Sequence, residues 1–445
     1  MQFSIREVIK NTNAILLKGD IQAEVKFNIS TDTRKIQKGD FYLPLRGENY
    51  DGHFFIDNAI KEGAIGYFTQ DKTKINNGAE FIIYVENSLV AYLKLANYIR
   101  RKINPKVVAI TGSSGKTTVK EMLFSVLNTT YKTYKTFLNH NNEIGLCETF
   151  FNMPIDTEYQ IVEMGMRNLG EIELLSNYAN PDIGIITNVG TAHVELLGNI
   201  KNIAIAKCEI ASHLKKEGTF IAPKCKNIEE TVKFEGEKIY TSLEDCKNIK
   251  IEKNKTTFEY KNETFELTVE GEHNVSNALL VIEAAKKAGV STENIKKGLL
   301  NFKPIEKRWE VSRIKDFNFI NDSYNANPES MKAAIKTFLS VNKPPIALVL
   351  GDMGELGKDS IKYHKEIGEF LSSYCKKDLD ITVLTVGELA KFILKASLLE
   401  GKSFKTNIDC AKYIVQNLKP DTTILLKASR FMKFEEIIET VKKLW

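Results

Sequence analysis

The segment Thr111–Thr118 contains the residue types that bind a nucleoside triphosphate. A lysine after a glycine-rich turn supplies positive charge to the β- and γ-phosphates, and the next threonine hydroxyl is a common ligand of Mg²⁺. The candidate nucleotide-binding residues are Gly112, Ser113, Ser114, Gly115, Lys116, Thr117 and Thr118.

The residues on either side predict the elements that position this segment. A β-branched apolar run over 107–110 predicts a buried strand, and residues 119–124 have helical periodicity. A strand, a glycine-rich turn and a helix N-terminus form an anion site, because backbone N–H groups and the helix dipole both favour negative charge. The usual phosphate loop has a glycine where this chain has Ile110, so an ordinary serine and glycine turn is the alternative.

Polar side chains also follow the next two predicted strands, 159–164 and 183–189. Ligands of parallel sheets bind beyond the carboxyl ends of the strands, so Glu163 is well placed for Mg²⁺ and His193 is a candidate metal ligand. Lys207 has small or apolar neighbours, and a buried lysine tends to lose its charge. Ordinary strand-end or surface roles are the alternatives for these three residues.

Further polar segments follow predicted strands or open predicted helices, as ligand-binding loops do. Their candidate residues are Asn139, Asn142, Asn274, Asn277, Asp322, Asn325, Asn327, Ser429 and Arg430. Asn274 and Asn327 also have the residue type of a helix N-cap, which is the alternative for both.

The bulk properties of the 445-residue chain are those of a globular protein with two or three domains. The net charge of +5 is small and the lysines are spread along the chain, so we expect no nucleic-acid partner. Six cysteines without a C-x-x-C pair argue against a zinc site and suit the cytoplasm. No apolar run approaches the ~20 residues of a membrane span, so we expect no membrane insertion. We expect a monomer.

The order of the predicted elements indicates an α/β protein with three domains, 1–104, 105–307 and 308–445. The first mixes short strands and helices. In the second, strands alternate with helices, which predicts a parallel sheet covered on both faces, with a hairpin over 256–269 as an antiparallel edge. We expect a helix over 200–214 there. The third repeats the alternation and predicts a smaller doubly wound domain.

Five segments together resemble the Mur ligase family, the ATP-dependent amino-acid-adding enzymes of peptidoglycan synthesis. The family loop T-G-[ST]-x-G-K-[ST]-[ST] fits 111–118, which explains the short loop. Similar segments occur in the family's order over nearly the whole chain, at Ser30–Arg34, Thr136–Gly145, Asp322–Pro328 and Leu350–Gly357. The chain is most similar to members that join D-alanyl-D-alanine to UDP-N-acetylmuramoyl-tripeptide. It departs from the pattern at Ala428, where members often have glycine.

The resemblance implies a small α/β N-terminal domain, a central P-loop-type ATPase domain with a parallel sheet, and a C-terminal Rossmann-like domain. It implies that Thr117 and Glu163 hold one Mg²⁺, and that His193 and Lys207, the latter as a carbamate, serve a second. Arg308 would lie near the γ-phosphate. The remaining implied contacts are Asn274 and Asn277 with adenine, Asp322 with ribose, Thr33, Arg34 and Gly47 with the uridine diphosphate, and Asn139, Asn142, Asn325, Asn327, Ser429 and Arg430 with the other substrate groups.

The implied reaction activates the tripeptide's terminal carboxylate as an acyl phosphate, which the amine of the dipeptide then attacks. Another amide ligase of the same architecture is the nearest alternative, either a diaminopimelate- or lysine-adding enzyme or a folylpolyglutamate synthetase. The segment Asn325–Pro328 disfavours both. A P-loop phosphotransferase or GTPase switch would need a guanine-reading motif or a kinase lid, and neither is evident. A non-catalytic subunit is disfavoured because Lys116, Glu163, His193 and Lys207 are all present.

Overall fold

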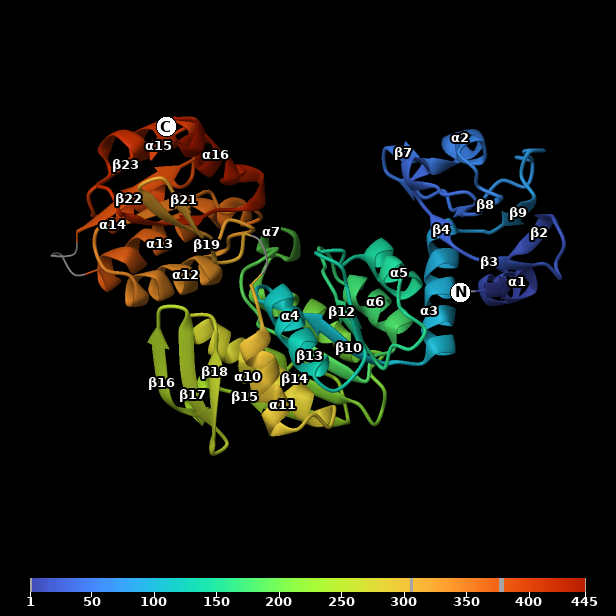
Figure 1. Ribbon diagram of the computed structural model, residues 1–445, viewed down its shortest axis with the longest axis horizontal. Coiled ribbons are helices and arrows are strands. Elements are labelled where there is room, and N and C mark those ends of the chain that lie inside the picture. Colours follow the sequence, from blue (N-terminus) through green and yellow to red (C-terminus); the bar gives the residue numbers. More distant parts are fainter. Residues whose placement is uncertain (1, 305–306, 376–379, 445) are drawn as a thin grey trace.

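The computed structural model describes residues 2–304, 307–375 and 380–444. The chain forms three α/β bodies in a row, with the N-terminal body at one end and the C-terminal body at the other (Figure 1). Each body has its own sheet. Within the described ranges, no helix combines the length and the apolar character that a membrane span requires. The fold class is the expected one, whereas the domain limits at 104/105 and 307/308 stay a prediction.

The N-terminal body contains a five-stranded mixed sheet in the order β2-β9-β8-β5-β4. Only the β2–β9 pair is antiparallel. The elements are β1 Gln2–Ser4, α1 Ile5–Thr12, β2 Ile15–Lys18, β3 Glu24–Lys26, β4 Ile29–Ser30, the 3-10 helix η1 Thr33–Lys35, β5 Phe41–Tyr42, β6 Arg46–Gly47, β7 Tyr50–Asp51, the 3-10 helix η2 Gly52–Phe55, α2 Ile56–Lys61, β8 Gly66–Thr69, β9 Phe81–Tyr84 and α3 Ser88–Ile103.

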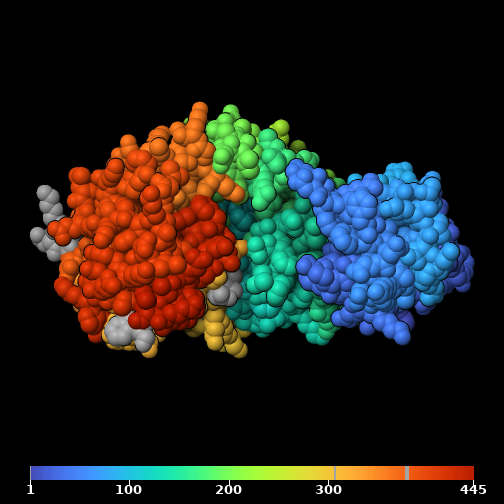
Figure 2. All heavy atoms as spheres, turned by 90° about the horizontal axis from the view of Figure 1, so that it is seen from above, coloured from blue at the N-terminus to red at the C-terminus, as the bar shows by residue number. Residues whose placement is uncertain are grey.

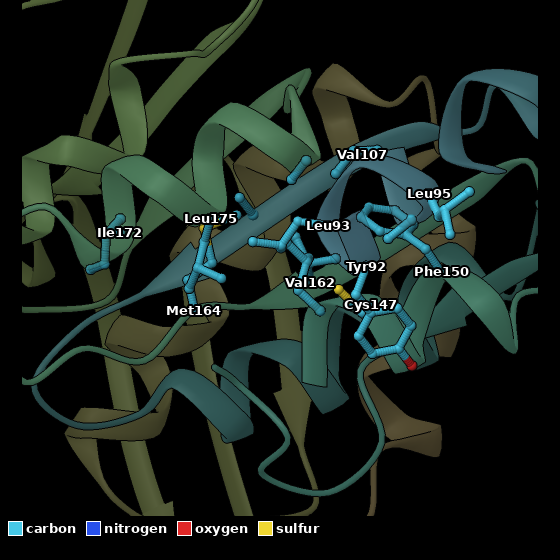
Figure 3. Packing of buried hydrophobic residues seen from close by; sticks show 14 of the residues in the cluster. Tyr92, Leu93, Leu95, Val107, Cys147, Phe150, Val162, Met164, Ile172 and Leu175 are labelled. Carbon is cyan, nitrogen blue, oxygen red and sulfur yellow. The ribbon is translucent and has the colours of Figure 1, made fainter. Parts of the chain in front are cut away.

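The helix α3 joins the N-terminal body to the central one. It packs against α5 (Glu143–Phe151) and α6 (Glu171–Ala179) of the central body. In Figure 3, Tyr92, Leu93 and Leu95 of this helix lie among the central residues Phe150 and Val162. Hydrogen bonds from the α3 side chains at 97 and 100 to the carbonyl oxygens of residues 178 and 180 add polar contacts. One continuous apolar core therefore connects the two bodies.

The central body is built on a six-stranded parallel sheet in the order β11-β12-β10-β13-β14-β15. Successive residues of β10 enter different cores: Val107 and Ala109 on one face, Val108 and Ile110 on the other. This confirms the prediction of a sheet covered on both faces. The elements besides α5 and α6 are β10 Lys106–Thr111, α4 Lys116–Leu127, β11 Thr133–Lys135, β12 Tyr159–Glu163, β13 Ile183–Ile186, α7 Val194–Leu197, α8 Ile200–Cys208, the 3-10 helix η3 Glu209–Ala211, β14 Thr219–Pro223, α9 Lys226–Glu229, β15 Glu237–Thr241, the 3-10 helix η4 Leu243–Asp245, β16 Cys246–Glu252, β17 Lys255–Tyr260, β18 Glu263–Leu267, α10 Glu272–Lys287 and α11 Thr292–Asn301.

Two expectations about this body are wrong. The hairpin β17–β18 does not extend the main sheet but forms a separate three-stranded antiparallel sheet with β16. Alternate hairpin residues such as Phe258 and Phe265 are buried against the core of α10 and α11, so the hairpin packs by its face and β15 forms the edge. The helix expected over 200–214 ends at Cys208 and continues only as the 3-10 turn η3.

The C-terminal body is a second doubly wound unit, as expected. Its six-stranded sheet has the order β19-β20-β24-β21-β22-β23, and only β19 is antiparallel to its neighbour. Alternate residues of β21 enter separate cores on the two faces. The elements are β19 Glu310–Ile314, β20 Phe317–Asn321, α12 Pro328–Val341, β21 Ile346–Gly351, the 3-10 helix η5 Gly357–Asp359, α13 Ser360–Tyr374, β22 Ile381–Val386, α14 Lys391–Ser397, β23 Gly401–Phe404, α15 Asn407–Asn417, β24 Thr423–Lys427, the 3-10 helix η6 Arg430–Met432 and α16 Glu435–Lys443.

Candidate active site

A cavity of about 1450 Å³ lies where the central and C-terminal bodies meet. Figure 2 shows a recess between these two bodies from above. The cavity collects most of the residues that the sequence marked as candidates. They are Ser113, Ser114, Gly115, Lys116, Thr117, Thr118, Asn139, Asn142, Glu163, His193, Asn274, Asn277, Arg308, Asp322, Asn325, Asn327, Ser429 and Arg430.

The glycines of the phosphate loop have conformations and neighbours that exclude a side chain. Gly112 has φ +153°, and a Cβ atom there would lie 1.8 Å from Thr187 Oγ1. Gly115, the residue before α4, has φ +78°. The loop is held by the segment after β13, because the backbone N–H of Ser114 donates to Asn188 Oδ1 at 2.9 Å. The segment after β13 thus helps to fix the shape of the loop backbone.

Lys116 begins α4, and its ammonium turns back over the loop. Nζ donates to the Gly112 carbonyl oxygen at 2.7 Å. Burial lowers the pKa of Lys116, while the nearby Glu163 carboxylate opposes that shift. A positive group held at the mouth of a glycine-rich loop is the arrangement that binds a polyphosphate.

Thr117 and Glu163 bring two oxygen ligands together below the loop. Thr117 Oγ1 donates to Glu163 Oε1 at 3.4 Å, and Asn141 Nδ2 donates to the same carboxylate oxygen at 3.0 Å. Glu163 Oε2 is buried and accepts no hydrogen bond from the described residues. A hydroxyl and a carboxylate fit Mg²⁺, which takes few protein ligands and completes its shell with phosphate oxygens and water. The described residues contain no group of three His, Cys, Asp or Glu side chains able to hold a metal.

His193 and Lys207 lie in different surroundings. His193 has φ +66° just before α7, and its Nδ1 lies 2.7 Å from Glu355 Oε2 of the C-terminal body. Lys207 on α8 is 1% exposed and is not among the described residues that line the cavity. Burial lowers its pKa well below the usual value, and the positive charge of Lys116 adds to the shift. Both effects favour the neutral amine at Lys207.

Other parts of the cavity wall come from α10 and from the segments that follow strands of the C-terminal body. Gly271 precedes α10, and Asn274 Nδ2 donates to the Glu270 carbonyl oxygen at 2.7 Å, so the N-cap alternative for Asn274 is wrong. Asn277 lies beside the phosphate loop at Gly115. Asp322, which follows β20, forms an ion pair of 2.7 Å with Lys427.

The substrate-facing candidates of the C-terminal body have structural partners as well. Asn327 caps α12 together with Ser330, which confirms the capping alternative for that residue. Ser429 Oγ accepts a hydrogen bond from the Gly354 N–H at 2.8 Å. Ala428, where the chain differs from the family motif, is fully buried. Arg430 lies 3.3 Å from Glu435 and is half-exposed.

Arg308 connects the C-terminal body to the phosphate loop. Its Nη2 donates to Thr117 Oγ1 at 3.1 Å, and its guanidinium lies over the Tyr324 ring at 4.2 Å. Glu329 of α12 accepts hydrogen bonds from the N–H and the hydroxyl of Thr191, at 3.1 and 3.0 Å. Sequence reasoning missed the parts played by Glu329, Tyr324 and Glu355, although each follows a strand end of the C-terminal sheet.

Thr33, Arg34 and Gly47 do not contribute to this cavity as far as the described residues go. They belong to the N-terminal body, with Thr33 and Arg34 on η1 and Gly47 on β6. Arg34 is exposed and pairs with Asp32 at 2.8 Å. The structure therefore separates these three candidates from the nucleotide loop.

Three family descriptions match the chain: "Mur ligase family, catalytic domain" over 27–112, "Mur ligase middle domain" over 110–285, and "Mur ligase, glutamate ligase domain" over 307–430. A UDP-N-acetylmuramoyl-tripeptide–D-alanyl-D-alanine ligase of Bacillus subtilis is 35% identical, with 98% of this chain and 97% of that protein aligned. The chain belongs to the Mur ligase family.

Solved structures place this Mur ligase within the family. A MurF crystal structure from Acinetobacter baumannii matches with a TM-score of 0.91 and 30% identity, covering 100% of this chain and 99% of that one. A MurF ligase from Thermotoga maritima in complex with ADP matches with a TM-score of 0.82 and 26% identity, covering 94% and 97%. This Mur ligase is of the MurF type and is an ATP-dependent amide-bond ligase.

Proposed function

We propose that this Mur ligase joins D-alanyl-D-alanine to the terminal carboxylate of UDP-N-acetylmuramoyl-tripeptide and converts ATP to ADP and phosphate. One observation carries the proposal: Lys116, the Thr117–Glu163 pair and Arg308 of the C-terminal body meet in one cavity. Similarity to ligases of that name over nearly the full chain supports the choice of substrates.

In the first step, a carboxylate oxygen of the tripeptide attacks the γ-phosphorus of ATP, and the bond to the β-γ bridging oxygen breaks to release ADP. Lys116 would exchange its contact with the Gly112 carbonyl for the phosphates, and Arg308 would face the transferring group. Both cations offset the charge that spreads over its oxygens. Thr117 and Glu163 would hold one Mg²⁺, which supplies Lewis-acid charge to the phosphate oxygens when bound.

In the second step, the amine of the dipeptide attacks the acyl carbon, and the tetrahedral intermediate expels phosphate. The carboxylate is a poor electrophile, and phosphorylation gives it a good leaving group. The C-terminal body covers the loop through Arg308, Tyr324 and Glu329. This cover would exclude water, which otherwise hydrolyses the acyl phosphate. Asn325, Asn327, Ser429 and Arg430 would contact the substrates from that side.

We further propose that Lys207 carries a carbamate and, with His193, serves a second Mg²⁺. Burial lowers the pKa of its amine and so favours the neutral form, whose nitrogen lone pair would attack CO₂ and whose nitrogen would then lose a proton. The product is a carbamate, which has an anionic oxygen that can bind a metal. A lysine amine has no oxygen ligand. His193 lines the cavity, and its second ring nitrogen, Nε2, would be the one to bind the metal, because Nδ1 lies against Glu355.

The N-terminal body would hold the uridine diphosphate part of the substrate through Thr33, Arg34 and Gly47. Adenine and ribose of ATP would lie along Asn274, Asn277 and Asp322, and Asn139 and Asn142 would face the reacting groups. We also propose that the protein is a monomer. We propose that it lies in the cytoplasm, since the six cysteines are free thiols that suit a reducing compartment.

Phosphate release from ATP tests this function. The purified protein should release phosphate only when both the nucleotide-sugar tripeptide and D-alanyl-D-alanine are present. Lys116→Ala should reduce the rate by about 10³-fold or more, the order that removal of a γ-phosphate cation produces, without unfolding the protein. Release with neither substrate would indicate a nucleotide switch, and a preference for a single amino acid as acceptor would indicate another amide ligase of the family.

A further inference from the structure

Lys120 is a buried lysine beside the candidate active site, and the proposed reaction does not use it. It lies on α4, three residues after Thr117, so the helix repeat brings both side chains to the same face. Its exposed fraction is 0%. A buried ammonium is costly unless charged and hydrogen-bonding partners surround it, so its partners show what holds it there.

The Lys120 ammonium makes one hydrogen bond and lies close to two carboxylates. Nζ donates to the Leu138 carbonyl oxygen at 2.5 Å. It lies 3.4 Å from Glu163 Oε2 and 3.5 Å from Glu121 Oε1. Lys120 therefore connects the helix after the phosphate loop with the carboxylate at the end of β12 and with the segment 137–141.

The two oxygens of Glu163 have different surroundings. Oε1 faces the hydroxyl of Thr117 and the amide of Asn141. Oε2 is buried, and the Lys120 charge balances it. The position of Lys120 thus determines which oxygen of the carboxylate faces the hydroxyl that begins the candidate Mg²⁺ site.

The contact with Leu138 explains an unusual backbone. Leu138 has φ +47°, a left-handed conformation that a leucine rarely adopts. Its side chain is half-exposed, so apolar burial does not hold it in this conformation. Its carbonyl oxygen instead turns inward to Lys120. The residues that follow, Asn139 and Asn141, line the cavity.

We propose that Lys120 is a positioning residue of this active site. It fixes the Glu163 carboxylate with Oε1 toward Thr117 and holds the segment 137–141 in the strained form that presents Asn139 and Asn141 to the cavity. The proposal rests on the proposed function in one respect, which is that Glu163 ligates Mg²⁺.

The test compares Lys120→Met with Lys135→Met. Lys135 pairs with the same Glu121 but is partly exposed and does not contact Glu163, so it is the matched control within the described network. In the metal-free protein without nucleotide, Lys120→Met should make amide hydrogen exchange at 137–141 about tenfold faster, because the buried hydrogen bond to the Leu138 carbonyl oxygen is lost. The Mg²⁺ concentration for half-maximal phosphate release should rise by about tenfold or more, as when a group behind a metal ligand is removed. Lys135→Met should leave both values unchanged.

A folded Lys120→Met protein with wild-type exchange at 137–141 and a wild-type Mg²⁺ requirement would overturn the proposal. If this variant does not fold, Lys120→Met combined with Glu163→Gln decides the matter. Neutralising the carboxylate should then restore folding, and a double variant as unstable as the single one contradicts the pairing. The comparison of hydrogen exchange needs no substrate or metal, so it tests the role of Lys120 separately from the proposed function. If the proposed function were wrong, the wild-type protein itself would show no Mg²⁺-dependent phosphate release.

Discussion

Three lysines around the active site differ in what surrounds the nitrogen atom. Lys120 has two carboxylates within 3.5 Å of its nitrogen, which hold the side chain in place. Lys116 turns to a carbonyl oxygen of its own loop and can move to a ligand. Lys207 has a cation as its charged neighbour, and burial favours the neutral amine. The surroundings, more than the residue type, therefore set the chemistry available to each lysine.

At the residue scale, the lowered pKa of Lys207 predicts how stability depends on pH. The lowered value in the folded state lies below the usual 10.5, so between the two values the unfolded chain binds one more proton at this residue. Stability should therefore rise with pH across that window. In CO₂-free buffer, the free energy of unfolding of the wild type should increase relative to that of Lys207→Met as the pH rises toward 10.5. Equal slopes for the two proteins would show that Lys207 keeps its charge when folded.

At the element scale, the strand, loop and helix over β10 and α4 form a unit whose shape depends on its glycines. The loop is packed against the segment after β13, where Thr187 and Asn188 contact it. The close approach of Thr187 leaves no space for a side chain at Gly112. The parallel order of β10 and β13 brings these two segments to the same sheet edge.

The substitution Gly112→Ala should therefore abolish nucleotide binding and destabilise the protein by more than the ~1 kcal/mol expected from backbone conformation alone. Gly170→Ala is the matched control, because Gly170 also has a positive φ, +85°, but the described residues leave open space around its Cβ position. Urea unfolding and calorimetric titration with ADP would measure both effects. A Gly112→Ala protein that behaves like Gly170→Ala would contradict the close packing.

At the scale of the whole molecule, the C-terminal body is docked on the central one by polar contacts, whereas the N-terminal body shares an apolar core with it. The docking contacts include Arg308 with Thr117, Glu329 with Thr191, Glu355 with His193, and Lys336 with Glu272. Polar contacts of this kind can be exchanged for water at modest cost, so we expect the C-terminal body to be the one that opens. The α3 core instead fixes the N-terminal body.

The substitution Glu329→Gln should favour the open form, because an amide offers one acceptor oxygen where the carboxylate takes two hydrogen bonds from Thr191. A hydrogen bond to a charged group contributes about 1.5–3 kcal/mol, so the ratio of closed to open molecules should fall by roughly tenfold or more. Small-angle scattering should show a larger radius of gyration, and kcat/KM should decrease. Glu366→Gln, which affects a long ion pair to Lys332 within the C-terminal body, is the control that should change neither.

Sequence reasoning succeeded where the signal is local. Apolar β-branched runs such as 107–110 became buried strands, and the polar residues at their ends met in one cavity. It missed β14 and β15, and it placed the hairpin β17–β18 on the wrong sheet, because strand pairing depends on which core the hairpin face covers.

The parts of the site that the sequence did not reveal depend on contacts between distant segments. Lys120 contacts Leu138 and Glu163, which lie 18 and 43 positions away in the sequence, as well as its neighbour Glu121. Glu329 contacts Thr191, which lies 138 positions away. Neither spacing nor residue type indicates such pairs. The roles assigned to the individual site residues stay predictions that the experiments above address.

Transfer of ¹⁸O tests the central claim most directly. UDP-N-acetylmuramoyl-tripeptide labelled with ¹⁸O in its terminal carboxylate is incubated with ATP, Mg²⁺, D-alanyl-D-alanine and the protein, and the released phosphate is analysed by mass spectrometry. Attack of the carboxylate on the γ-phosphorus predicts that each phosphate carries one oxygen from the peptide. Phosphate without ¹⁸O, formed alongside the amide product, would contradict the acyl phosphate route and the site geometry on which it rests.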